Sequence, residues 1–197
     1  MRPLLCFARQ GAEIMEEQNK TPEKLVNMYD WLQSLVSAVV VLVLIFITGL
    51  IRPVDVDGSS MVPTLIDGDK IITTSLYGTL RQGDIVVLTK KSFGETSIVK
   101  RVIATEGQTV DIDFNAGTVT VDGTVLEEPY IADLTRTPGN LSYPLTVEKG
   151  HIFCMGDNRN HSTDSRFSSI GQIDTRCVLG KVLFRILPIR SFGGVYS

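Results

Sequence analysis

The stretch Leu35-Val-Ser-Ala-Val-Val-Val-Leu-Val-Leu-Ile-Phe-Ile-Thr-Gly-Leu-Ile51 divides this chain into a short leader and a longer C-terminal part. It belongs to an uncharged segment, residues 31–51, that lies between Asp30 and Arg52. A helix over this segment is about 31 Å long at ~1.5 Å per residue, which matches the hydrocarbon core of a bilayer. Apolar side chains occupy every face, whereas a surface helix of a soluble domain has one apolar stripe. The sequence therefore predicts one membrane-spanning helix over residues 31–51.

A cleaved signal peptide is the main alternative for an apolar segment in this place. Signal peptides have a shorter apolar stretch followed by a small-residue cleavage site, but here Arg52-Pro-Val-Asp55 follows. We therefore expect a retained anchor. Lys20 and Lys24 outnumber Arg52 among the cations near the segment, which favours an N-terminus on the cytoplasmic side. Residues 1–30 are then a mobile cytoplasmic tail, and residues 52–197 form an extracytoplasmic domain of a single-pass cell-membrane protein.

Composition excludes several classes of function. The 197 residues leave room for one domain and an appendage. Lys and Arg number 19 against 22 Asp and Glu, so the chain lacks the cationic excess that nucleic acid requires, and we expect no nucleic-acid partner. Three cysteines, with no C-x-x-C pair and no H-E-x-x-H motif, predict neither a metal site nor a cofactor. Cys154 and Cys177 lie in apolar stretches and are expected as buried thiols, with a disulfide between them as the alternative.

Residues 52–197 have the pattern of a mainly β domain. Short stretches rich in β-branched residues alternate with Gly and Asp. Asp122-Gly123 predicts a type I′ hairpin, because both central positions of that turn need positive φ. Residues 127–148 contain several prolines and are expected to be a loop-rich excursion between strands. The predicted strands cover residues 70–74, 84–89, 97–103, 108–112, 118–121, 151–155 and 177–184.

A lysine is a better candidate for a catalytic residue than either histidine. His151 and His161 have no acidic partner at a spacing typical of a catalytic pair. Strand alternation places Lys100 on the same face as the apolar Ile98 and Val102. Burial favours the neutral amine, which can then act as a general base. The alternative is an edge-strand lysine whose amine extends to water.

Two other segments are candidates for the same site. The segment Gly58-Ser-Ser-Met-Val-Pro-Thr-Leu65 is a serine-rich turn a few residues beyond the apolar segment, and taken alone it could be an ordinary loop. The segment Gly156-Asp-Asn-Arg-Asn-His-Ser-Thr-Asp-Ser-Arg166 gathers two Asp and two Arg behind an apolar predicted strand. Such a loop is either a solvated turn or a network that fixes catalytic side chains.

Together these segments resemble the type I signal peptidases, which are membrane-anchored serine endopeptidases with a Ser/Lys dyad. The resemblance covers roughly residues 30–187, and its last motif is highly specific. Only about 55 residues separate Lys100 from Gly156, so the chain resembles the compact Gram-positive-type members. The four matching motifs occur in the family's order at Gly58–Thr64, Arg81–Val87, Val99–Ile103 and Gly156–Arg166.

The resemblance implies roles for individual residues. Ser60 is the nucleophile, its N–H is an oxyanion donor, and Lys100 is the general base. Gly58 stands where some members have a serine hydroxyl, so the second oxyanion donor is expected from the backbone or from water. Ser162 is expected to bind the lysine amine, with an Asp164–Arg166 ion pair behind it. Loop stabilisation is assigned to Asp157 and Asn158.

The resemblance also implies partners. Substrates are secreted preproteins cut after a small-x-small sequence of their signal peptides, bound as strands between Pro53–Gly58 and Ser97–Val99. The other partners that the resemblance implies are membrane lipid and a nearby secretion translocon. A self-cleaving repressor with a Ser/Lys dyad is a weaker match, because it needs a DNA-binding module where this chain has its apolar segment. A catalytically decayed, anchored β-domain that binds secreted proteins remains open.

Overall fold

One long helix fills the described part of the N-terminal unit, which ends at Gly49. The computed structural model describes residues 23–89 and 97–196. Helix α2 spans Glu23–Leu50, and its window Asn27–Phe46 has a mean hydropathy of 1.9, long and apolar enough to cross a membrane. None of this window is buried.

The helix differs from the predicted span at both ends. It begins at Glu23, eight residues before the predicted start, so residues 23–30 of the expected tail are helical. The prediction stopped at the charge of Asp30, but a charge limits only the part of a helix that lies in hydrocarbon. At the other end Ile51 leaves the helix and starts β1 (Ile51–Asp55), where it pairs with Thr74. Residues 1–22, with Cys6, lie outside the described part.

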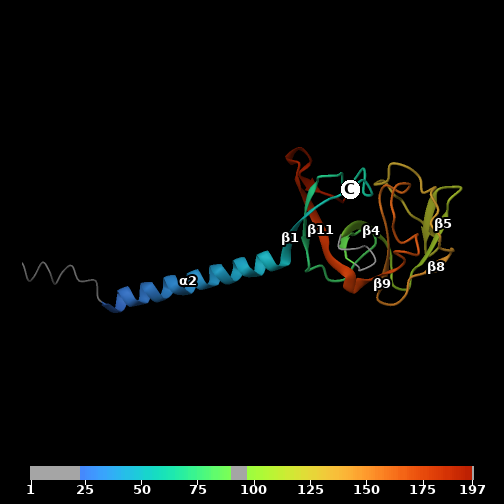
Figure 1. The fold of residues 1–197 in the computed structure, drawn as a ribbon. Coiled ribbons are helices and arrows are strands. Elements are labelled where there is room, and N and C mark those ends of the chain that lie inside the picture. Colours follow the sequence, from blue (N-terminus) through green and yellow to red (C-terminus); the bar gives the residue numbers. More distant parts are fainter. Residues whose placement is uncertain (1–22, 90–96, 197) are drawn as a thin grey trace, which may run out of the picture. The chain divides into compact units, whose positions relative to one another are not determined.

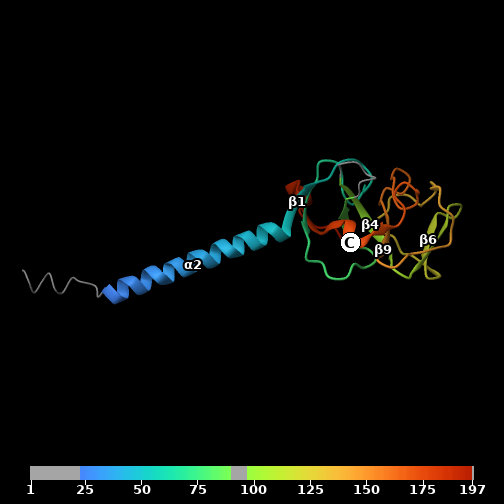
Figure 2. The ribbon, with the colours of Figure 1, turned by 60° about the horizontal axis from the view of Figure 1, so that its bottom comes forward.

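The unit Leu50–Ser197 contains two antiparallel sheets. Eight strands form the first, in the order β1-β2-β11-β3-β4-β9-β10 with β12 paired to β11, and four form the second, in the order β7-β6-β5-β8. The second sheet lies beside β9, away from β1 (Figures 1 and 2). The remaining bounds are β2 Lys70–Thr74, β3 Ile85–Leu88, β4 Ile98–Thr105, β5 Thr109–Asp113, β6 Thr118–Val121, β7 Thr124–Val125, β8 Leu145–Thr146, β9 His151–Met155, β10 Ile173–Asp174, β11 Val178–Leu187, β12 Gly193–Gly194 and the 3₁₀ helices η2 Thr175–Cys177 and η3 Ile189–Ser191.

Strand β4 runs through the middle of the first sheet. Its residue Lys100 pairs with Val86 of β3, and Arg101 pairs with Met155 of β9. Six of its eight residues are buried, because apolar clusters cover both faces. The alternative of an edge-strand lysine is therefore wrong.

Three apolar clusters hold the domain together. The first joins β1, β2, β3 and β11 to the turn that follows β1, through Met61 and Leu65. The third joins the two sheets, with Phe153 of β9 packed among residues of β5 and β6. The second lies under the loop before β3 and includes Cys154. Burial of the branched side chains on both sides of β4 is the main stabilising contribution expected for such a sheet.

The expected mainly β class is confirmed, and each of the seven predicted strand regions contains a strand. The hairpin turn also has the expected conformation, with φ of 51° at Asp122 and 80° at Gly123. Strand β1 was missed, because its residues were divided between the apolar segment and the loop after it. Both described cysteines are free thiols, Cys154 buried and Cys177 half-buried, so the disulfide alternative is wrong.

Candidate active site

Ser60 lies on the turn that follows β1. The turn opens at Gly58, whose φ of 87° disfavours a side chain and whose N–H donates to Asp67 Oδ1 at 2.8 Å. Next to Ser60, Met61 is fully buried in the first apolar cluster, and its carbonyl accepts a hydrogen bond from Leu65 at 2.9 Å. The turn is thus anchored on both sides of the half-buried Ser60. The amide of Gly58 is engaged and is not a free oxyanion donor.

The amine of Lys100 lies against the hydroxyl of Ser60. Nζ and Oγ are 2.7 Å apart and share a hydrogen bond, although the residues come from a central strand and a distant turn. Lys100 is only 3% exposed. Burial lowers the pKa of its amine, and the charges of Asp164 and Asp157 oppose this shift only in part. A buried amine with a lowered pKa next to a hydroxyl can accept the hydroxyl proton.

The loop from Gly156 to Arg166 passes directly beside Ser60. The N–H of Asn158 donates to the Ser60 carbonyl, and its side-chain amide donates to the Ser59 carbonyl, both at 3.0 Å. A Cβ on Gly156 would lie 2.4 Å from the Ser60 carbonyl oxygen. Only glycine fits this contact, so the loop and the serine turn are in direct backbone contact.

The expected ion pair between Asp164 and Arg166 is present and fully buried. Arg166 donates to both carboxylate oxygens, at 2.8 and 2.9 Å, and also to the carbonyl of Arg159 at 2.6 Å. The N–H of Gly156 donates to Asp164 Oδ2 at 3.0 Å. The pair therefore closes the loop on itself and fixes the glycine that touches Ser60.

Ser162 differs from expectation. Its Oγ is buried, and within the described residues it has no hydrogen-bond partner, so the expected bond to the Lys100 amine is not formed. The amine is directed at Ser60 instead, while Ser162 packs against Gly156, where a Cβ would lie 2.3 Å from its Oγ. Ser162 therefore lies beside the site without a hydrogen bond to the amine.

Asp157 does more than stabilise its own loop. It receives two hydrogen bonds from the guanidinium of Arg101, at 2.8 and 2.7 Å, and one from Thr64 Oγ1 at 2.5 Å. Arg101 and Thr64 were not predicted as site residues, although both lie in the quoted motifs. Together they join the strand that carries Lys100, the turn that carries Ser60 and the loop beside both.

The loop-rich excursion also reaches the site, which no local sequence signal indicated. Glu128 accepts two hydrogen bonds from the buried Arg159, at 2.8 and 2.5 Å. The ring of Tyr130 lies 3.9 Å from the guanidinium carbon of Arg101. Asn160, which had no expected role, accepts the backbone N–H of Arg136 at 3.0 Å and so holds the excursion to the same loop.

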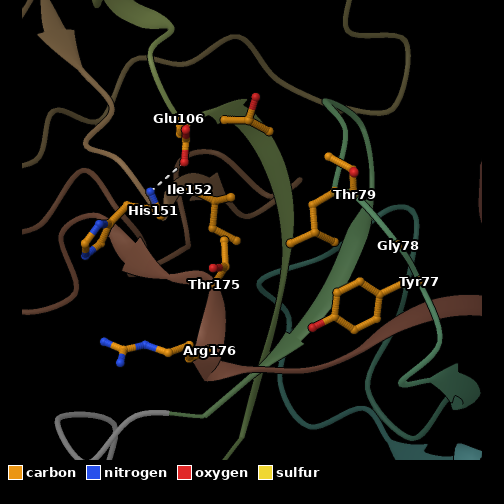
Figure 3. A pocket seen from close by; sticks show the side chains of 11 residues that line it. Tyr77, Gly78, Thr79, Glu106, His151, Ile152, Thr175 and Arg176 are labelled. Atoms are coloured by element: carbon orange, nitrogen blue, oxygen red, sulfur yellow. Dashed lines mark hydrogen bonds between the residues drawn. The ribbon is translucent and has the colours of Figure 1, made fainter.

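A cavity of about 540 Å³ lies elsewhere, at the far ends of β4 and β9 (Figure 3). Glu106 at its edge accepts the N–H of Gly150 at 2.7 Å, and His151 points its ring away from Glu106 to bind the Lys149 carbonyl. Neither Ser60 nor Lys100 lines this cavity. Over residues 23–89 and 97–196, no group of three or more His, Cys, Asp or Glu side chains is placed to hold a metal ion.

Comparisons with known proteins agree on one family. The model of the family "Signal peptidase, peptidase S26" matches residues 28–187. Signal peptidase I T of Bacillus subtilis is 37% identical over 191 residues, covering 88% of this chain and 95% of the relative. A signal peptidase I of Bacillus licheniformis is 32% identical over 181 residues, covering 87% and 95%. A solved signal peptidase I of Enterococcus faecalis is 27% identical with a TM-score of 0.42, covering 53% and 97%. The chain therefore belongs to the signal peptidase family, peptidase S26, and is a peptidase.

Proposed function

We propose that this protein is a type I signal peptidase that removes N-terminal signal peptides from secreted preproteins, with Ser60 as nucleophile and Lys100 as general base. The observation that carries the proposal is the 2.7 Å contact between the Lys100 amine and the Ser60 hydroxyl in a buried setting. Relatives named signal peptidase I supply the substrate class.

The mechanism follows from this contact. The neutral amine of Lys100 takes the proton of Ser60 Oγ as the oxygen attacks the scissile carbonyl carbon. The resulting ammonium donates a proton to the leaving amine, and an acyl-enzyme forms on Ser60. The mature protein leaves with this amine as its new N-terminus. Lys100 then takes a proton from a water molecule whose oxygen attacks the ester carbonyl, the bond to Ser60 Oγ breaks, and the ammonium returns the proton to that oxygen as the signal peptide leaves with a free carboxyl group. Neither metal nor cofactor takes part in any of these steps.

The oxyanion of each tetrahedral intermediate needs hydrogen-bond donors. Within the described residues, the N–H of Ser60 has no acceptor of its own, so it is available for this role. The Gly58 amide is held by Asp67, which leaves the second donor to water or to a rearranged backbone.

Substrates bind as added strands in this proposal. Strand β1 is the edge of the first sheet, and β4 pairs with β9 only from Arg101 onward. Main-chain groups of Ile98 and Val99 therefore face no described strand on the β9 side. Both free edges are next to the site in the chain, because β1 is followed by the turn that carries Ser60 and β4 contains Lys100. Main-chain hydrogen bonds on such edges provide affinity, and side-chain pockets provide selectivity for small residues.

Helix α2 anchors the enzyme in the membrane, in contact with lipid, with residues 1–30 inside the cell and the catalytic domain outside, near the secretion translocon. Protease added to intact spheroplasts should digest the domain and spare a tag at residue 1. Digestion of the tag with protection of the domain would reverse this orientation.

Activity is tested with purified full-length protein and a synthetic preprotein that carries an Ala-x-Ala site. We expect one cut directly after the second alanine, identified by mass, and no cut when that alanine is replaced by phenylalanine. The Ser60→Ala variant should leave the substrate intact. Tight binding of preprotein without cleavage by the wild type would instead favour the decayed, non-enzymatic domain.

A further inference from the structure

Tyr130 stands between two buried arginines. The guanidinium carbon of Arg101 lies 3.9 Å from the centre of its ring, and that of Arg159 lies 5.9 Å away. Both distances are within the range of cation–π attraction, which is stronger when the groups are shielded from water. Its hydroxyl donates to Glu128 at 3.0 Å, and burial raises the pKa of the phenol, so it stays a donor.

Each of the two guanidinium groups donates four in-plane hydrogen bonds to oxygen atoms. Arg101 donates to Asp157 and to the carbonyl of Gly83, and Arg159 donates to Glu128 and to the carbonyl of Gly156. The faces of the two guanidinium groups remain for contact. An aromatic ring is the side chain suited to cover such a face.

The two arginines are connected to the turn of Ser60 through different residues. Through Asp157, Arg101 is connected to Thr64, which lies in the turn that carries Ser60. Through its carbonyl bond, Arg159 holds Gly156, the residue that packs against the Ser60 carbonyl. The ring of Tyr130 connects the two arginines, because it lies within cation–π distance of both guanidinium groups.

We propose that Tyr130 is a positioning residue of the peptidase reaction: its ring keeps Arg101 and Arg159 at the separation that places Ser60 Oγ against Lys100 Nζ. The proposal rests on the proposed function, because it assumes that these two atoms react. It assigns a role to the excursion 127–148, which supplies Tyr130 and its partner Glu128 from outside the four family motifs.

Displacement of the ring should be visible in the titration of Lys100. The charged or titratable groups around the amine are Asp164, Asp157 and Arg166 from the loop after β9 and Cys154 from β9 itself. Tyr130 is connected to these groups through Arg101 and Arg159. If Arg101 and Arg159 are held less firmly, water can reach the Lys100 amine. Contact with water weakens the effect of burial and raises the pKa of Lys100.

The test compares Tyr130→Leu, Tyr130→Phe and Tyr77→Leu in the full-length protein, with kcat and KM measured across pH. Tyr130→Leu should lower kcat at least about tenfold with KM within about twofold, and should move the acidic limb to higher pH. Tyr130→Phe keeps the ring and should stay within about threefold of wild type. Tyr77 is the matched control, a half-buried tyrosine that binds the Val178 carbonyl away from Ser60, and its variant should lose stability alone.

A Tyr130→Leu enzyme with wild-type kcat and pH limb would overturn the proposal. So would a loss of kcat that merely follows the folded fraction, with the limb unmoved, because that is the behaviour of a structural residue. If the leucine variant does not fold, Tyr130→Met provides the same comparison, with rates normalised to the folded fraction from circular dichroism.

Ser60→Ala and Lys100→Arg, assayed on the same substrate, separate the two proposals. If either retains activity, the proposed dyad fails. If both are inactive while Tyr130→Leu behaves as wild type, the dyad stands and only the positioning role is lost.

Discussion

The backbone N–H of Asn158 donates a hydrogen bond to the carbonyl of Ser60 at 3.0 Å. The two residues are far apart in the sequence, yet the bond uses main-chain atoms alone. The place of Ser60 is therefore set as much by the backbone of the loop after β9 as by its own turn. Changes in that loop are expected to act on the serine even where no side chain touches it.

The neighbouring serines Ser59 and Ser60 offer an internal control for the nucleophile. Ser60→Ala removes the hydroxyl bound to Lys100 and should lower kcat/KM by at least about a thousandfold. Ser59→Ala removes a hydroxyl outside this contact and should lower it by less than about tenfold, measured by cleavage of the same preprotein. An inactive Ser59 variant beside an active Ser60 variant would assign the nucleophile to Ser59.

Activity should fall on the acidic side of the pH–rate profile. Burial lowers the pKa of Lys100, so the amine is neutral above a midpoint that lies below the ordinary lysine value. As pH falls through that midpoint, the amine binds a proton and can no longer accept one from Ser60. Lys100→Arg should be inactive at every working pH, because the guanidinium stays charged.

Histidine variants check the origin of this acidic limb. His151 binds the Lys149 carbonyl at the rim of a different cavity, and His161 is exposed. The variants His151→Ala and His161→Ala should both keep the limb in a profile of kcat/KM against pH. Disappearance of the limb in either one would point to an imidazole as the base.

Gly156→Ala tests the contact between the loop and the serine turn. The added methyl would lie 2.3 Å from Ser162 Oγ and 2.4 Å from the Ser60 carbonyl oxygen, so the two segments must move apart. A shift of this size should lower kcat by about a hundredfold. Gly194→Ala is the control, because nothing lies within 4 Å of its added methyl, and it should retain activity. Wild-type turnover by Gly156→Ala would show that the contact is not needed.

Replacement of Lys100 by methionine should stabilise the fold while abolishing activity. With the pKa lowered in the folded state, the unfolded chain binds more protons between the folded and unfolded pKa values. The wild type therefore gains stability as pH rises through that window, and below it the penalty of the buried ammonium is fully present. Methionine has no such penalty and should gain about 1 kcal/mol near neutral pH, with a smaller gain as pH approaches ~10.

The measurement is the free energy of unfolding in urea at pH 6.5 and at pH 9.5, where the second value is closer to the ordinary lysine pKa of ~10.4 and the gain from methionine should be smaller. Lys70→Met is the control, since Lys70 is half-exposed and pairs with the exposed Asp55. It should change stability little at either pH. A destabilised Lys100→Met variant at neutral pH would show that the amine contributes more through its contacts than its burial removes.

Local pattern was sufficient for most strands but not for the ends of the long helix. The composition of Lys70–Thr74 and His151–Met155 predicted strands with those bounds, because both are short stretches rich in apolar or β-branched residues. Strand β1 contains Arg52 and Pro53 and exists through its pairing with β2, which no short-range signal encodes. The start of α2 at Glu23 similarly depends on helix formation continuing beyond the apolar segment.

The predicted site residues fall into two groups. Ser60 and Lys100 lie in the motifs that suggested them, and their assignment as nucleophile and base stays a prediction until the variants are assayed. Tyr130 and Glu128 could not be foreseen, because their role depends on which faces of distant arginines they meet in space. The bond expected from Ser162 failed for the same reason: spacing indicates nearness but not the direction of a hydroxyl.

Strand β1 follows α2 without any intervening residue, and Ser60 is only ten residues beyond Leu50. A fully extended chain of that length reaches at most ~35 Å. If the helix spans the bilayer as proposed, this short connection limits how far Ser60 can lie from the lipid surface. With the proposed function, we then expect that a scissile bond held farther than this from the lipid surface escapes cleavage, whatever residues flank it.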